Sequence, residues 1–130
     1  MKREVKFRFR LQLKAESFGK YRKGDIDTFY INLLDDKTGL AYFPIEKKMW
    51  DIVSCDEYTG LKDKNGKEMY DKDIVKADSG DIMLINWNNE FASFCLDKNG
   101  WAFSHFFMEA VKPEHCEVIG NFYQHPHLLK

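Results

Sequence analysis

The first clear pattern of hydrophobic and polar positions spans residues 4–14, where the two classes alternate. The apolar positions are Val5, Phe7, Phe9, Leu11 and Leu13. A period of two over this length predicts a strand with one buried face. We expect that face to enter a core, and the charged face between these positions to meet water or a partner.

Further short apolar or aromatic runs follow, separated by sequences rich in Asp, Asn and Gly. They predict strands at 28–34, 40–43, 52–55, 74–77, 81–87, 91–96, 101–104 and 116–123. Asp can bond its own backbone and Gly supplies positive φ, so 63–66 and 97–100 predict tight turns. Residues 15–26 read as a loop and 45–51 as a short helical turn. Residues 105–110 suit either a strand or a helical turn.

Short strands joined by closely spaced turns predict an all-β, mainly antiparallel fold with one or two short helical turns. Eleven Phe, six Tyr and three Trp also favour strands. Between residues 73 and 96, a strand, a tight turn, a long strand ending in Trp87 and an aromatic strand suit a small SH3-like barrel. We expect an N-terminal β lobe over 1–57 and the SH3-like barrel lobe over 58–130, together in one compact unit.

Three motifs stand out: 58–75 (Tyr-Thr-Gly-Leu-Lys-Asp-Lys-Asn-Gly-Lys-Glu-Met-Tyr-Asp-Lys-Asp-Ile-Val), Lys6-Phe7-Arg8, and 117–123 with Pro126, Leu128 and Leu129 after it. In this order they resemble the YopX family of phage and prophage proteins. The resemblance implies a mostly β protein of a mobile element, in a bacterial cytoplasm. It also implies assembly of several subunits and no enzymatic activity.

The chain departs from the family pattern at two places. The family usually has Trp shortly after the Lys-Phe-Arg opening, where this chain has Arg10 and Leu11. It usually has Gly before Asp-Ile-Val, where this chain has Lys72. Either Lys72 adopts a left-handed conformation, at a cost of about 1 kcal/mol, or the turn is of another type.

Charge is unevenly distributed although the net charge is −1. Residues 1–24 hold nine Lys and Arg against two Glu. Such asymmetry indicates either a basic surface that binds a negatively charged partner or a strand face whose charges are simply solvated. The candidate nucleic-acid contacts are Lys6, Arg8, Arg10, Lys14, Arg22 and Lys23.

Candidate catalytic and metal-binding residues are sparse. Cys116 adjoins His115, but neighbours in a strand point to opposite faces and make a poor dyad. His125 and His127 share a strand face, yet no second pair completes a zinc site, so we expect no metal and no cofactor. The three cysteines, Cys55, Cys95 and Cys116, form no C-x-x-C pair, which predicts buried free thiols in a reducing cytoplasm. No run has the length of a membrane span, and the N-terminus lacks the apolar region of a signal peptide.

These observations predict a non-catalytic accessory protein of a phage or prophage that acts as a self-associating interaction module. Large aromatics exceed what a small core readily hides, which favours a homo-oligomer or another protein partner. The aromatics in question are Trp50, Trp87, Trp101, Phe106 and Phe107. The alternative is a nucleic-acid-binding small β-barrel that uses the basic face of the N-terminal strand.

Overall fold

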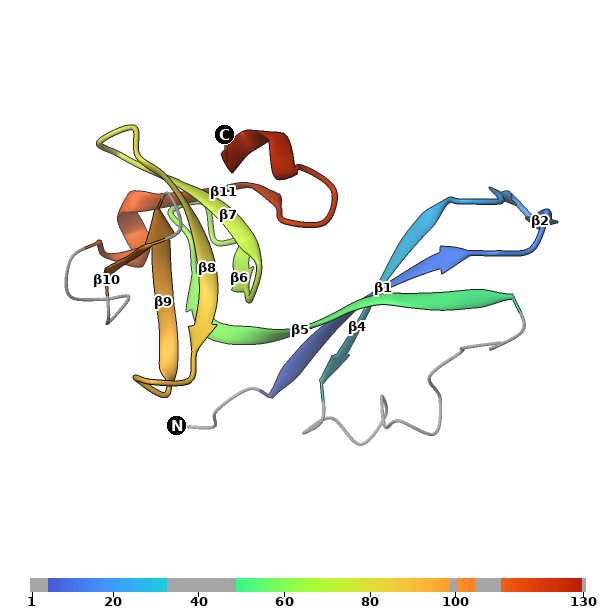
Figure 1. Cartoon of the computed structure of the whole chain (residues 1–130), viewed down its shortest axis with the longest axis horizontal. Helices are drawn as coiled ribbons and strands as arrows, with labels where there is room; N and C mark the ends of the chain where they lie inside the picture. The colour runs from blue at the N-terminus through green and yellow to red at the C-terminus, as the bar shows by residue number, and fades with distance from the viewer. Residues whose placement is uncertain (1–4, 33–48, 99–100, 105–110, 130) are drawn as a thin grey trace. The chain divides into compact units, whose positions relative to one another are not determined.

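The computed structural model describes residues 5–32, 49–98, 101–104 and 111–129 (Figure 1). The strands are β1 (Lys6–Leu13), β2 (Ser17–Phe18), β3 (Tyr21–Arg22), β4 (Ile26–Asn32), β5 (Trp50–Lys62), β6 (Glu68–Tyr70), β7 (Asp73–Ala77), β8 (Ile82–Asn88), β9 (Ser93–Lys98), β10 (Trp101–Ser104) and β11 (Cys116–Asn121). Two short 3-10 helices, η3 (Pro113–His115) and η4 (Pro126–Leu129), are also described. Strand β1 pairs antiparallel with β4 and β5, and the pairs β7–β11, β7–β8 and β8–β9 are also antiparallel. These pairings confirm the all-β, mainly antiparallel class. The chain divides into two compact units, Met1–Tyr58 and Thr59–Lys130, here called unit 1 and unit 2.

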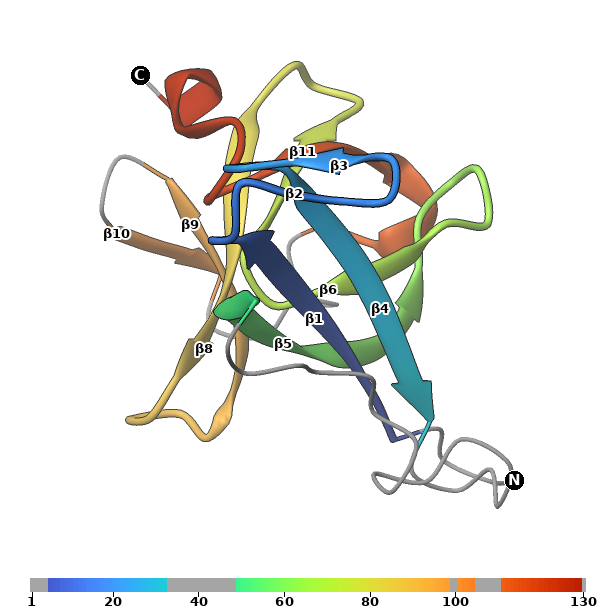
Figure 2. The ribbon, with the colours of Figure 1, turned by 90° about the vertical axis from the view of Figure 1, so that its right-hand side faces the viewer.

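In unit 1, β1 lies between β4 and β5 and pairs antiparallel with both (Figure 2). This confirms the strand predicted from the alternation at 4–14. The register to β5 shifts between Arg10 and Leu11, the mark of a β-bulge. Leu11, Leu13 and Trp50 form a buried cluster at the end of β1 that follows the bulge.

The expectation that the charged face of β1 meets water is wrong at Arg8 and Arg10. Their exposed fractions are 6% and 2%. Both guanidinium groups bond to Asp56 on β5, directly opposite Arg8 in the register. A hydrophobic pattern predicts each strand separately. It therefore does not reveal that Arg8 pairs with the carboxylate of Asp56, 48 residues away.

In unit 2, the last residues of β5 turn back into β6, and five further strands form a sheet in the order β10-β9-β8-β7-β11. Buried residues of β7 and β8 supply four of the seven residues in its core cluster. The buried cluster consists of Met69, Val75, Ala77, Met83, Ile85, Leu96 and Cys116. The turn predicted at 63–66 lies where expected, between β5 and β6.

The closed SH3-like barrel is not found: among the described residues the five-stranded sheet is open, with β10 and β11 at its edges. The outer edge of β11 is occupied instead by the turn after β5. The N–H of Lys64 donates to the carbonyl of Cys116 (2.9 Å), and the N–H of Val118 donates to the Asp63 carboxylate (2.9 Å). With those groups bonded, β11 has a satisfied edge without a further strand.

Several other predictions differ from the structure or concern residues that it does not describe. The helical turns found are η3 and η4, whereas 105–110 and most of 45–51 lie outside the described residues, as does the strand predicted at 40–43. Trp50 begins β5 instead of a helical turn. The side chains of Trp101, Phe106 and Phe107 are likewise outside the described set. No helix in the described ranges has the length and apolar character needed to span a membrane.

Candidate functional site

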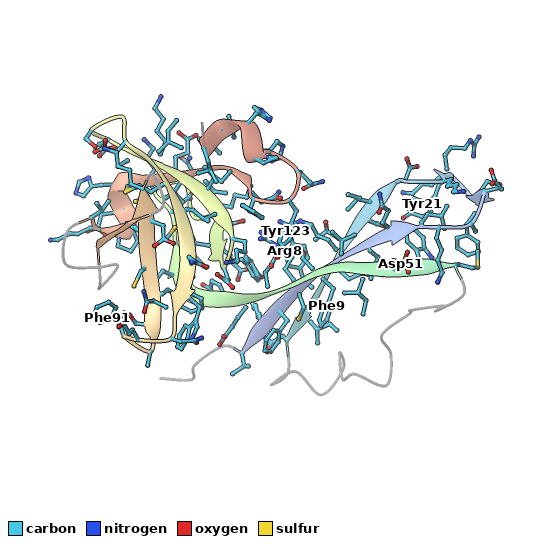
Figure 3. The ribbon with its side chains drawn as sticks, viewed as in Figure 1. Arg8, Phe9, Tyr21, Asp51, Phe91 and Tyr123 are labelled. Carbon is cyan, nitrogen blue, oxygen red and sulfur yellow. The ribbon has the colours of Figure 1, made fainter. Side chains whose placement is uncertain are left out.

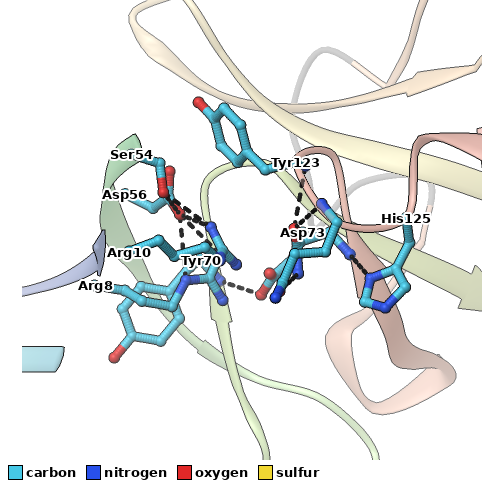
Figure 4. Close-up of polar contacts among 10 residues, drawn as sticks. Arg8, Arg10, Ser54, Asp56, Tyr70, Asp73, Tyr123 and His125 are labelled. Carbon is cyan, nitrogen blue, oxygen red and sulfur yellow. Dashed lines mark hydrogen bonds and ion pairs between the residues drawn. The ribbon is translucent and has the colours of Figure 1, made fainter. Parts of the chain in front are cut away.

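Arg8 and Arg10 lie in a buried charged cluster with Ser54 and Asp56 (Figure 4). Asp56 Oδ2 accepts from Arg8 Nε (3.2 Å), Arg8 Nη2 (3.0 Å) and Arg10 Nη1 (2.5 Å). Arg10 Nη1 also donates to Ser54 Oγ (3.1 Å). In this arrangement both guanidinium groups serve as interior partners of Asp56, because their donors are directed at buried oxygens of β5.

The other four candidate nucleic-acid contacts lie nearer the surface of unit 1. Lys6 is half-buried, with its Nζ 5.5 Å from the ring centroid of Tyr58. Lys14, Arg22 and Lys23 are exposed. Lys14 and Lys23 form ion pairs with Asp51 (3.4 Å) and Glu16 (3.7 Å). The structure therefore separates the six residues into a buried pair, a half-buried lysine and an exposed group, and a nucleic-acid role stays a prediction.

The segment 15–26, expected to be a loop, contains the two-stranded hairpin β2–β3 at one end of unit 1 (Figure 2). Its strands are two residues long, too short for a period of two to be read from the sequence. Phe18 pairs with Tyr21 across the hairpin, and Phe18 is 50% exposed. Phe18 and Lys20 are exposed on this hairpin and were not among the contacts predicted from the sequence.

Tyr21 fastens this hairpin to the rest of unit 1 (Figure 3). Its ring packs edge-on against Trp50, with ring centroids 5.1 Å apart. Its hydroxyl donates a short hydrogen bond to Asp27, and that bond raises the pKa of Tyr21. The neutral phenol is the donor in this contact, so the hairpin keeps its anchor across the neutral pH range.

In unit 2, the first of the sequence motifs depends on the buried carboxylate of Asp63. Its Oδ1 accepts from the N–H groups of Asn65 and Lys67 (2.9 Å each), which closes the turn between β5 and β6. Its Oδ2 accepts from Val118 of β11 (2.9 Å). One side chain thus ties the motif at 58–75 to the motif at 117–123.

Lys72 adopts the left-handed conformation, with φ of 70°. Asp73 shapes this bend by accepting from the N–H of Tyr70 (2.9 Å) (Figure 4). The backbone of Lys72 donates to Ile85 (2.8 Å) and accepts from Phe122 (2.9 Å). Its Nζ donates to the Asn86 side chain. Glycine would adopt this backbone conformation without strain. The hydrogen bonds of Lys72 on both sides of the bend stabilise the same conformation for a lysine.

Gly120 and Asn121 organise the C-terminal motif. A Cβ at position 120 would lie 2.8 Å from Nδ1 of His125 and 2.9 Å from Cδ1 of Leu128, so glycine permits this close approach. Asn121 Oδ1 accepts from Tyr123 (3.1 Å) and Gln124 (2.9 Å). The N–H of Asn121 donates to His125 Nδ1 (3.2 Å), which places the imidazole proton on Nε2.

Two exposed aromatic side chains, Trp87 and Phe91, lie on the β8–β9 hairpin of unit 2 beside Phe94, which is half-buried against the core of this unit. The three residues are here called the aromatic hairpin surface. Trp87 and Phe91 are 42% and 40% exposed, and Phe91 is labelled in Figure 3. Trp87 and Phe94 pair across the strands in an edge-to-face arrangement, with centroids 5.1 Å apart. The indole N–H donates to Asn89 Oδ1 (2.9 Å).

Of the residues considered for catalysis or metal binding, His125 and His127 have ring centroids 6.2 Å apart in an edge-to-face arrangement. His115 Nδ1 is 2.8 Å from Asp78 Oδ2, on the surface. Burial raises the pKa of the Cys116 thiol to about 11, which keeps it protonated at neutral pH. Within the described ranges, no three His, Cys, Asp or Glu side chains are grouped so as to hold a metal ion.

The expectation of buried thiols holds at Cys95 and Cys116 but is wrong at Cys55, which is exposed. Cys55 lies on β5 opposite Phe9, on the face of the sheet away from Asp56. Partial burial, and then the nearby Asp56, raise the pKa of its thiol.

The chain matches a protein family model and is similar to a solved structure. A model of the YopX protein family matches residues 15–130. No curated protein matches the chain. Among solved structures, the chain is similar to protein EF1440 from Enterococcus faecalis, with 19% sequence identity over 97% of this chain and 98% of that chain and a TM-score of 0.49.

Proposed function

The chain belongs to the YopX protein family, and we propose that it is a phage or prophage accessory protein that acts in the bacterial cytoplasm as a self-associating, non-catalytic interaction module. The observation that carries the proposal is the aromatic hairpin surface of unit 2. Two large apolar side chains, each about two-fifths exposed, lie on one short hairpin, and a partner that covers both would remove them from water together. The partner we propose is a second copy of the chain.

The polar groups around this surface favour burial against a partner. The Trp87 N–H already has an acceptor in Asn89, so covering the ring leaves no unpaired donor. Asn88 Oδ1 accepts from the N–H groups of Glu90 (2.9 Å) and Phe91 (3.1 Å), which fixes the turn that carries Phe91. A surface that is ordered before binding loses less entropy when it binds.

Removal of these side chains from water supplies the driving force. Full burial of one large apolar side chain contributes about 1.5–3 kcal/mol. In a two-fold dimer the same surface is used by both copies, so each aromatic contributes twice. The buried centres of protein interfaces are enriched in aromatic residues relative to the rest of the surface, and this contact would have that composition.

The experiment is light scattering coupled to size-exclusion chromatography at micromolar protein concentration. We expect a mass of two or more chains for the natural sequence and a shift to monomer for Trp87→Ser with Phe91→Ser. Phe18→Ser with Ile52→Ser is the matched control, since both residues are large, apolar and at least half exposed in unit 1. A strict monomer in the natural sequence, or equal dissociation in both double variants, contradicts the proposal.

A further inference from the structure

We propose that the β2–β3 hairpin of unit 1, residues 14–25, binds the backbone of single-stranded nucleic acid, with phosphates on Lys20 and Arg22 and a base stacked on Phe18. This inference is independent of self-association, because it concerns other residues in the other unit. It also differs from the sequence-based alternative, since Arg8 and Arg10 are buried in the charged cluster with Asp56.

The hairpin is a fixed ribbon. At its base, Leu13 donates to the carbonyl of Asp25 (2.9 Å) and accepts from the N–H of Gly24 (2.8 Å). The N–H of Lys23 donates to the carbonyl of Glu16 (3.1 Å). With Tyr21 packed on Trp50, these bonds fix the backbone that carries the exposed side chains.

The charges on the ribbon suit a polyanion. Within the described part of the chain, the side-chain nitrogens of Lys20 and Arg22 have no carboxylate partner: Lys20 Nζ lies 5.4 Å from the Tyr21 ring centroid, and Arg22 Nη1 makes a long bond of 3.4 Å to the Tyr21 carbonyl. The Asp25 carboxylate instead accepts from the backbone N–H of Arg22 (2.8 Å). A guanidinium group can hold a phosphate through two parallel hydrogen bonds. Lys14 and Lys23 form only exposed ion pairs, which are weak and readily exchanged.

The exposed aromatic ring selects the form of nucleic acid. Phe18 is half exposed beside Lys20, and stacking on an aromatic ring requires a base whose face is free. Bases of a single strand meet that condition, whereas those of a duplex are stacked on each other. Basic side chains that follow the backbone, interleaved with aromatics that take the bases, are the means by which proteins bind single strands without sequence preference.

The test is fluorescence anisotropy of a labelled oligothymidine of about 20 nucleotides, a length beyond the usual site size, with the full chain. The natural sequence is expected to bind, with an affinity that falls as salt rises from about 50 to about 200 mM. Lys20→Glu with Arg22→Glu is expected to weaken binding by about tenfold or more. It should also reduce the slope of log affinity against log salt concentration by about 1.4, the value for loss of two phosphate contacts on a single strand. Phe18→Ala is expected to weaken binding without changing that slope.

The matched control is Lys67→Glu with Lys76→Glu, which changes the net charge by the same amount at exposed positions of unit 2. It is expected to leave the affinity within about threefold of the natural sequence. Lys20→Gln with Arg22→Gln, checked by thermal melting, replaces the reversal variant if that one fails to fold. Absent binding at low salt, equal weakening by both double variants, equal affinity for a duplex, or displacement by poly-glutamate as effective as by unlabelled oligonucleotide overturns the proposal.

Discussion

Units 1 and 2 place polar side chains in their interiors in different ways. In unit 2, Asp63, Asp73 and Asn121 accept hydrogen bonds from backbone N–H groups that turns leave unpaired. In unit 1, the buried polar residues include two guanidinium groups that converge on the carboxylate of Asp56. Backbone capping is a local device that contributes to a turn, whereas a buried ion cluster stabilises only while both signs of charge are present.

The largest effect that separates the two units is expected from Asp56→Asn. The change leaves both guanidinium groups without their buried counter-charge, and removal of one partner of such a pair costs about 3–5 kcal/mol. Urea unfolding followed by fluorescence measures this loss. Asp51→Asn is the control, since Asp51 and Lys14 are exposed and their pair contributes little. Equal stability of the two variants contradicts the role given to Asp56.

A smaller effect is expected from Gly120→Ala in unit 2. The new methyl group would lie under 3.0 Å from the His125 ring and from Leu128, and such overpacking costs about 1–3 kcal/mol. The same change made in a His125→Ala background should cost less, because one of the two obstructing side chains is gone. A double-mutant cycle by thermal unfolding measures the coupling, and an unchanged cost in both backgrounds shows that the ring is not the obstacle.

The left-handed conformation of Lys72 predicts a difference of about 1 kcal/mol in the free energy of unfolding between two variants. Lys72→Gly should be more stable than Lys72→Ala by that amount, because both remove the side chain and only glycine adopts φ of 70° without strain. At Lys76, which lies in the extended strand β7, the order should reverse by about 0.5–1 kcal/mol. Chemical denaturation of the four variants measures both differences, and the same order at both positions would contradict the left-handed backbone at Lys72.

The smallest effect concerns the exposed pair of His115 and Asp78. Hydrogen bonds from His115 and then Lys64 lower the pKa of Asp78 below its usual 3.8. A carboxylate with a lowered pKa in the folded state adds stability above its unfolded pKa and loses that contribution as the pH falls through the folded pKa. His115→Gln should raise the Asp78 pKa toward its usual value in an NMR titration. Asp81, whose pKa is lowered chiefly by Lys98, is the internal control and should not move.

The sequence predicted the parts of the fold that depend on neighbouring residues. Turn chemistry indicated the bend at 63–66, and alternation indicated β1. The departure from the family pattern at Lys72 indicated two alternatives, of which the left-handed one is found. Each of these follows from the preferences of a few adjacent residues, so no partner strand had to be known.

The parts that the sequence did not predict depend on distant partners. Burial of Arg8 required the pairing of β1 with β5, and the bond from Val118 to Asp63 joins residues 55 apart. That second contact places the turn after β5 against β11 at the edge of the sheet, an arrangement that the barrel prediction did not include. The surfaces proposed for binding, around Trp87 and Phe18, likewise depend on exposure that only the folded strands define.

The most direct test of the difference between the units is native-state hydrogen exchange on the natural sequence and on Asp56→Asn. We expect slow amide hydrogen exchange in β7 and β8, whose core side chains are fully buried, in both proteins. We expect Asp56→Asn to accelerate exchange in β1, β4 and the first half of β5 while β7 and β8 stay protected. Equal acceleration in both units, or none in β1, would contradict a unit 1 that depends on its buried ion cluster.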